Sequence, residues 1–195
     1  FYLEQITDNL MILPAWEEMP EQVQSHVIRI DPGTAFGTGK HETTRMCLQA
    51  LEENRPEKPW AMLDVGTGSG ILSVYGAMLG AEKITAIDID PEAVRWAEKN
   101  INLNKLPVKI DLSTTPLESI SGTYNVIAAN IILKTILELS PLFPGLLTPD
   151  GLLILSGILR EQIEPVEEQL QELGLIGIEI TNMGEWACLT AKKQA

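Results

Sequence analysis

The stretch Leu63-Asp64-Val65-Gly66-Thr67-Gly68-Ser69-Gly70-Ile71-Leu72 decides the fold of this 195-residue chain. An apolar strand enters a glycine-rich turn there, and the turn opens an apolar helix. Glycines suit such a turn because the backbone must bend tightly and approach a ligand without Cβ atoms in the way. The pattern therefore predicts the strand–turn–helix unit with which many α/β proteins bind nucleotides.

Segments on both sides of this turn alternate between strand and helix patterns. We predict short strands at residues 11–13 and 27–30, and further strands at residues 61–65, 83–89, 108–112, 124–129 and 152–155. Helices are predicted after His41, at 71–79, from Pro91, at 134–142 and at 161–173. Two last strands, 175–180 and 186–191, are joined by so short a link that only an antiparallel pair can form. The sequence thus predicts an α/β fold: a Rossmann-like, doubly wound, mostly parallel seven-stranded sheet with a C-terminal antiparallel hairpin.

Two acidic residues indicate which nucleotide the turn binds. Asp88 ends the next strand about 20 residues on, where a carboxylate accepts hydrogen bonds from ribose hydroxyls. A role for Asp88 as a helix cap is disfavoured because Asp90 already fills it. The third glycine comes one residue earlier than in the dinucleotide fingerprint, and the Asp64 carboxylate is a poor neighbour for a pyrophosphate. It is a good neighbour for the cationic amino group of a methionine, which disfavours a nicotinamide-dependent oxidoreductase.

Two motifs resemble known enzymes. The run from Asp64 to Gly70 resembles the first motif of class I S-adenosylmethionine-dependent methyltransferases. Asp31-Pro32-Gly33-Thr34-Ala35-Phe36-Gly37-Thr38-Gly39-Lys40-His41-Glu42-Thr43-Thr44 closely resembles the segment before that motif in the PrmA family of ribosomal-protein methyltransferases. Further matches follow in order at residues 129–131, 155–159 and 184–186. The resemblance implies S-adenosylmethionine as the cofactor, and lysine or N-terminal amines of a ribosomal large-subunit protein as the methyl acceptors.

The same motifs supply the candidate site residues. Phe36 and Gly37 would form a loop that folds over bound cofactor, and Thr44 can hydrogen-bond the methionine carboxylate while also facing the core. Asn130 follows the fourth predicted strand and is the candidate catalytic residue, expected to contact the cofactor or the incoming amine. His41 is better suited to cap or brace the loop than to act as a general base. The predicted cofactor-binding set is Phe36, Gly37, Thr44, Asp64, Gly66, Gly68, Asp88 and Asn130, with no metal ligands.

Composition narrows the classes of partner. A net charge of −13 argues against direct binding of nucleic acid. An acidic surface can instead steer a basic substrate, or it can serve solubility alone. No apolar run approaches the roughly 20 residues of a membrane span. Cys47 and Cys188 show no metal-ligand spacing and are expected to be buried thiols of a cytoplasmic protein.

The N-terminal part leaves the substrate open. We predict a methyltransferase domain at residues 31–195, and a linker or the remnant of a missing substrate-recognition domain at residues 1–30. Asn130 is followed by Ile131-Ile132-Leu133 rather than by two prolines and an aromatic ring, which argues against adenine or a glutamine amide as the acceptor. A methyltransferase acting on another protein or a small amine, and a non-catalytic cofactor-binding relative, remain as alternatives. The sequence does not define an oligomeric state.

Overall fold

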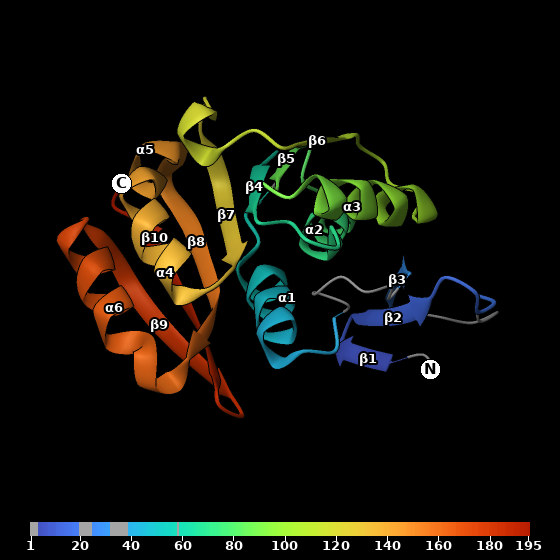
Figure 1. The fold of residues 1–195 in the computed structure, drawn as a ribbon, viewed down its shortest axis with the longest axis horizontal. Coiled ribbons are helices and arrows are strands. Elements are labelled where there is room, and N and C mark those ends of the chain that lie inside the picture. The colour runs from blue at the N-terminus through green and yellow to red at the C-terminus, as the bar shows by residue number, and fades with distance from the viewer. Residues whose placement is uncertain (1–3, 20–24, 32–38, 58) are drawn as a thin grey trace.

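A seven-stranded sheet forms the centre of the molecule (Figure 1). The computed structural model describes residues 4–19, 25–31, 39–57 and 59–195. The strand order is β6-β5-β4-β7-β8-β10-β9, with β4 to β8 parallel and β10 antiparallel to both of its neighbours. This arrangement confirms the predicted doubly wound sheet and its C-terminal hairpin. The strands are β4 (Ala61–Val65), β5 (Lys83–Ile87), β6 (Ile110–Ser113), β7 (Tyr124–Asn130), β8 (Leu147–Leu159), β9 (Leu175–Met183) and β10 (Trp186–Lys193).

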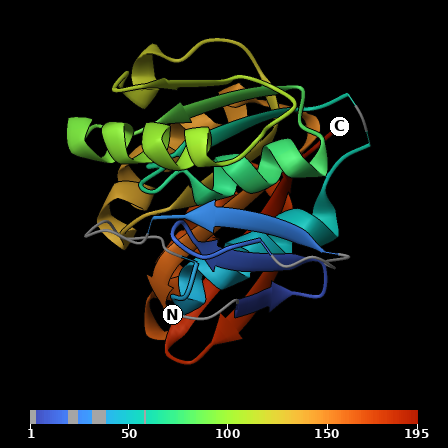
Figure 2. The ribbon, with the colours of Figure 1, turned by 90° about the vertical axis from the view of Figure 1, so that its right-hand side faces the viewer.

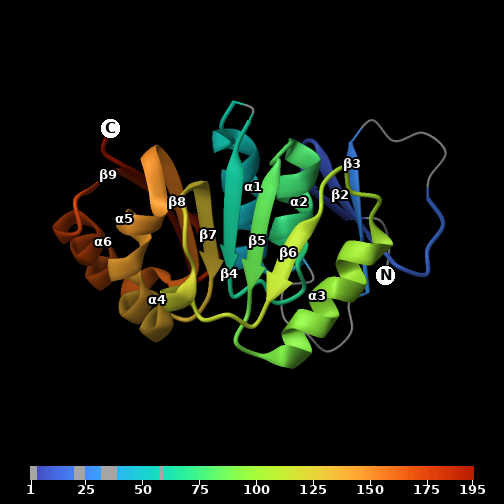
Figure 3. The ribbon, with the colours of Figure 1, turned by 90° about the horizontal axis from the view of Figure 1, so that it is seen from above.

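Helices pack on both faces of this sheet because alternate strand residues point to opposite sides. Met62 and Leu63 of β4 are both fully buried, yet they belong to different apolar clusters. Met62 packs in the cluster of α1 and α2, whereas Leu63 packs in that of α4, α5 and α6. Figure 3 shows α4, α5 and α6 gathered near β7 to β9, and α3 beside β6. The helices are α1 (Glu42–Asn54), α2 (Ile71–Leu79), α3 (Pro91–Leu103), α4 (Leu133–Leu139), α5 (Phe143–Leu146) and α6 (Ile163–Glu172).

A smaller sheet precedes the main one in the chain. It consists of β1 (Glu4–Thr7), β2 (Leu10–Pro14) and β3 (His26–Ile30), with β1 antiparallel and β3 parallel to β2. Figures 1 and 2 show this blue sheet next to α1, which lies between it and the central sheet. The side chain of Asn104 accepts from the Arg29 amide at 2.9 Å and donates to the Arg29 carbonyl at 2.8 Å. The two strands expected near residues 11–13 and 27–30 are confirmed, whereas β1 was not predicted.

Several predicted boundaries were wrong, and contacts between elements explain them. β5 ends at Ile87 because its carbonyl accepts the amides of Gly66 and Thr67 from the glycine turn. β8 extends well beyond residues 152–155 because it pairs with both β7 and β10. The helix expected at 134–142 ends as α4 at Leu139, and a 3₁₀ turn containing Pro141 follows, since proline has no amide to continue the helix. No helix in the described ranges is long and apolar enough to cross a membrane.

Candidate functional site

The glycine turn lies at the carboxyl edge of the central sheet, between β4 and α2. Gly66, Gly68 and Gly70 have φ values of 71°, 53° and 81°, a region that residues with a Cβ rarely adopt. The amide of Gly66 donates to the carbonyl of Ile87 at 2.8 Å, which ties the turn to the end of β5. Open α/β sheets bind their ligands at this edge, so Gly66 and Gly68 lie where a nucleotide site is expected.

Asp88 directs its carboxylate toward this turn. One oxygen accepts a hydrogen bond from the Gly68 amide at 3.0 Å, and the other accepts from the Asp90 amide at 3.0 Å. Asp90, as predicted, caps α3 by accepting from the Glu92 amide at 2.9 Å. Asp88 is only partly buried, so its carboxylate combines a fixed orientation with access from the edge of the sheet.

Asp64 is buried beneath the same turn, with 1% of its surface exposed. Its Oδ2 accepts hydrogen bonds from the hydroxyls of Thr67 and Ser73, each at 2.7 Å. Its Oδ1 is buried without a hydrogen-bond partner among the described residues. Burial raises the pKa of Asp64, and the bonds from Thr67 and Ser73 offset part of that rise. The roles of Thr67 and Ser73 were missed; two hydroxyl residues inside an otherwise apolar and glycine-rich motif were the available signal.

Asn130 and Thr44 form a second polar contact, which joins the end of β7 to the start of α1. Asn130 ends β7, and its Nδ2 donates to the Thr44 hydroxyl in the first turn of α1 at 3.3 Å. Its Oδ1 is buried and has no hydrogen-bond partner in the part of the chain that the structure describes. Thr44 is 1% exposed, which agrees with the expectation that it faces the core, and its contact with the methionine carboxylate stays a prediction.

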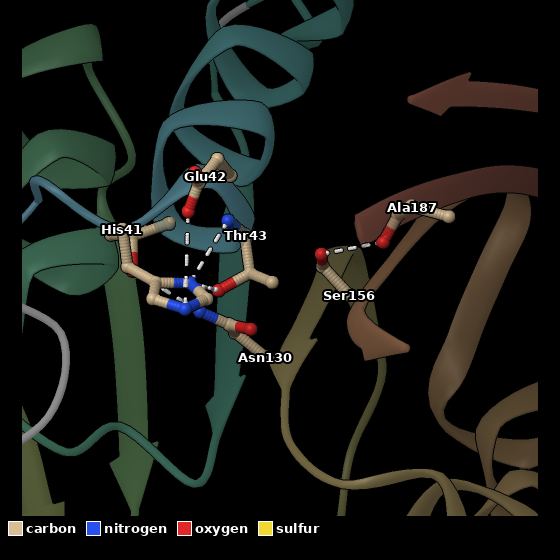
Figure 4. A network of polar contacts seen from close by, with 7 residues as sticks. His41, Glu42, Thr43, Asn130, Ser156 and Ala187 are labelled. Carbon is tan, nitrogen blue, oxygen red and sulfur yellow. Dashed lines mark hydrogen bonds and ion pairs between the residues drawn. The ribbon is translucent and has the colours of Figure 1, made fainter. Parts of the chain in front are cut away.

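His41 braces the start of α1. It is the N-cap residue, and its Nδ1 accepts from the Thr43 amide at 3.3 Å and lies 2.9 Å from the Thr43 hydroxyl (Figure 4). Its ring packs edge-on against Trp186 of β10, with the centroids 5.0 Å apart. This geometry agrees with the predicted bracing role. It also fixes the helix turn that carries Thr44.

Phe36 and Gly37 fall outside the described residues. Cys47 and Cys188 are both buried free thiols, as expected. A cleft of about 630 Å³ opens at the end of β8 and the β9–β10 turn, and its lining includes the carboxylates of Glu161 and Glu185.

Comparison with known proteins identifies the family. The sequence profile described as "Ribosomal protein L11 methyltransferase (PrmA)" matches residues 3–194. A ribosomal protein L11 methyltransferase of Pelobacter propionicus is 45% identical over 193 residues, which cover 96% of this chain and 62% of that protein. One of Geotalea daltonii is 43% identical over 196 residues and also matches over 62% of its length. This chain therefore spans less than two thirds of the length of these relatives.

A solved structure agrees with that result. The crystal structure of a ribosomal protein L11 methylase from Lactobacillus delbrueckii subsp. bulgaricus is 34% identical, with a TM-score of 0.92 and full coverage of both chains. The profile match, the sequence identities and the fold comparison therefore agree on one family, and each covers nearly all of this chain. It belongs to the ribosomal protein L11 methyltransferase (PrmA) family.

Proposed function

We propose that this chain is the catalytic domain of an S-adenosylmethionine-dependent protein N-methyltransferase. Its acceptors in this proposal are lysine or N-terminal amines of ribosomal protein L11, the protein after which its relatives are named. The observation that carries the proposal is the pair of buried acceptor oxygens, on Asp64 and Asn130, that flank the glycine turn without a partner in the described ranges. N–H groups of a cationic ligand at Asp64 and of an acceptor amine at Asn130 would satisfy them.

The residues around the turn fit S-adenosylmethionine. The Asp88 carboxylate, oriented by the Gly68 amide, would accept the ribose hydroxyls. The buried Asp64 would face the cationic methionine amino group, directly or through water, because opposite charges attract strongly where water is excluded. Ile89, which is 83% exposed directly after Asp88, offers apolar surface to the adenine ring. Phe36 and Gly37 remain candidates for a loop that closes over the cofactor.

Asn130 is the candidate catalytic residue in this proposal. Because its Nδ2 is engaged by Thr44, the amide is oriented with Oδ1 available to accept an N–H bond from the incoming amine. Such a bond would hold the amine nitrogen in line with the methyl group. Orientation of this kind can contribute about 7–11 kcal/mol to lowering a barrier.

The bound S-adenosylmethionine supplies a methyl group that is already activated by its positive sulfur. An acceptor amine must be neutral to attack such a methyl group, so it would first release its ammonium proton to solvent. Burial of the amine against Asn130 and Thr44 lowers its pKa by desolvation. His41 is engaged in capping α1, so the chain is assigned no dedicated general base.

Recognition of the acceptor protein involves a wider surface in this proposal. The cleft beside β8 lies at the same edge as Asn130. Its lining carries Glu161 and Glu185 against one cation, Arg160, so a net negative charge there suits a basic acceptor segment. Residues 1–30 are proposed as the linker or remnant of a substrate-recognition domain. Methylation of a ribosomal protein also implies a cytoplasmic location.

The test is isothermal titration of the chain with S-adenosylmethionine, with NADH as the control ligand, followed by transfer of labelled methyl groups to purified L11. We expect the chain to bind S-adenosylmethionine but not NADH, and the labelled methyl groups to appear in L11. Binding without transfer to L11 would favour another acceptor or a non-catalytic relative. Binding of NADH alone would overturn the cofactor assignment.

A further inference from the structure

Ile131 follows the candidate catalytic Asn130 and lies between two glycines, Gly66 in the turn after β4 and Gly157 in β8. A Cβ on Gly66, at the end of β4, would collide with Ile131 Cγ2. A Cβ on Gly157, near the end of β8, would collide with the Ile131 carbonyl oxygen and lie 2.8 Å from its carbonyl carbon. Real Cβ atoms essentially never approach other atoms closer than 3.0 Å. The side chain of Ile131 therefore occupies space that only a glycine at 66 leaves open, and its backbone occupies space that only a glycine at 157 leaves open.

Hydrogen bonds hold the backbone of Ile131 in this place. Its amide donates to the carbonyl of Ser156 at 3.1 Å. Ser156 is fully buried, and its hydroxyl donates to the Ala187 carbonyl of β10 at 2.8 Å (Figure 4). The peptide that follows Asn130 is thus attached to β8, and through Ser156 to β10, while the Ile131 side chain bears on the glycine turn.

We propose that Ile131 is a positioning residue that sets the separation between the glycine turn and the Asn130 amide. The proposal rests on the proposed function, in which the turn holds the methyl donor and Asn130 holds the acceptor. Asn130 shares a peptide bond with Ile131, so any shift of Ile131 against Gly66 moves the Asn130 side chain relative to the turn. A displacement of about 1 Å at such a centre costs about 100-fold in rate.

The two glycine contacts make the proposal testable without cofactor. The collision at Gly66 involves a side-chain atom of Ile131, whereas the collision at Gly157 involves its backbone. Ile131→Ala should therefore lower the urea midpoint of unfolding when it is made in the wild type, but raise the midpoint when it is added to Gly66→Ala. Added to Gly157→Ala, it should not raise the midpoint. Gly174→Ala is the matched control, because Gly174 has a similarly positive φ of 77° with nothing within 4 Å of its Cβ position.

The kinetic arm separates positioning from packing. We expect Ile131→Ala to lower kcat about 100-fold while the dissociation constant of S-adenosylmethionine stays close to that of the wild type. Ile131→Val keeps Cγ2 and should restore most of kcat. Gly174→Ala should match the wild type in both. Two results would overturn the proposal. One is a wild-type kcat in Ile131→Ala, and the other is an equal loss of stability in Gly66→Ala and in the double variant Gly66→Ala/Ile131→Ala.

Failure of the proposed function has a different signature. If the wild type binds no S-adenosylmethionine, the proposed function fails. The role of Ile131 can then still be tested in the free protein, through the NMR chemical shift of the Asn130 side-chain amide. The signal should shift in Ile131→Ala and Gly157→Ala and stay in place in Gly174→Ala. An unshifted signal in all three variants would refute the positioning role.

Discussion

The side-chain amide of Asn130 donates a hydrogen bond to the hydroxyl of Thr44 across 3.3 Å, although the two residues lie 86 positions apart. The bond joins the end of β7 to the first turn of α1, and His41 caps that turn. An amide that donates through Nδ2 has its Oδ1 directed elsewhere, so in this arrangement Asn130 presents an acceptor away from Thr44. Thr44 thus acts on the candidate catalytic residue as well as lining the site.

This coupling predicts a non-additive pair of variants. Asn130→Ala should keep much of the affinity for S-adenosylmethionine and lose turnover, because it removes the acceptor for the amine but leaves the turn intact. Thr44→Val, which removes only the hydroxyl, should lower kcat in the same direction. The double variant should be no slower than Asn130→Ala alone, because both act through one interaction. Titration calorimetry and a labelled-methyl assay check this.

The control for these variants is Asn102→Ala, an exposed asparagine on α3. It should match the wild type in binding and in rate. Fully additive losses from Thr44→Val and Asn130→Ala would contradict the coupling, and wild-type turnover in Asn130→Ala would remove that residue from the mechanism.

A second prediction concerns Asp88. Asp88→Ala removes a charged acceptor proposed for two ribose hydroxyls, and hydrogen bonds to charged groups contribute about 1.5–3 kcal/mol each. We expect the affinity for S-adenosylmethionine to fall by at least about 100-fold. Asp111→Ala, an exposed carboxylate on the neighbouring strand β6, makes the same change in net charge and should bind normally. Equal affinities of the two variants in calorimetry would argue that Asp88 only orders the turn.

The site could be predicted from the sequence where a local motif encodes it. The glycine turn, Asp88 and the capping role of Asp90 follow from spacing along one strand–turn–helix unit, and each lies as expected. The Asp64–Ser73 bond and the approach of Gly157 to Ile131 depend on how separate segments pack. The hydrophobic periodicity of the sequence does not predict such packing. The small N-terminal sheet was only partly predicted for the same reason, since the pairing of its strands is a contact between segments.

Asp64 predicts a dependence of stability on pH. Burial raises the folded-state pKa of this carboxyl above its ordinary value, so the folded protein holds that proton more tightly than the unfolded chain does. The group's contribution to stability is therefore greatest at pH values below the unfolded pKa, and it is lost as pH rises through the folded pKa. The free energy of unfolding of the wild type, relative to Asp64→Asn, should fall as pH rises through that range.

The same variant tests the proposed partner of Asp64. An asparagine places a neutral amide where the carboxylate would meet the methionine amino group, so S-adenosylmethionine should bind Asp64→Asn more weakly. Urea unfolding across pH and calorimetry at neutral pH measure the two effects. A pH-independent difference between the proteins would contradict the buried, proton-holding carboxyl, and unchanged affinity would remove Asp64 from the ligand site.

Glu52 predicts the opposite dependence on pH at the junction of the two sheets. Burial alone would raise its pKa, but hydrogen bonds from Thr7, Tyr75 and Asn9 outweigh that effect and hold the pKa below its ordinary value. A depressed folded-state pKa stabilises the fold above the unfolded value, and this stabilisation is lost as pH falls through the folded pKa. Glu52→Gln should therefore unfold at lower urea concentration than the wild type at pH 7, and the difference should shrink toward pH 3. Glu53→Gln changes the exposed neighbour of Glu52 and should unfold like the wild type at either pH. Equal midpoints for all three proteins at pH 7 would mean that the hydrogen bonds of Glu52 with Thr7, Asn9 and Tyr75 do not attach the small sheet to α1 and α2.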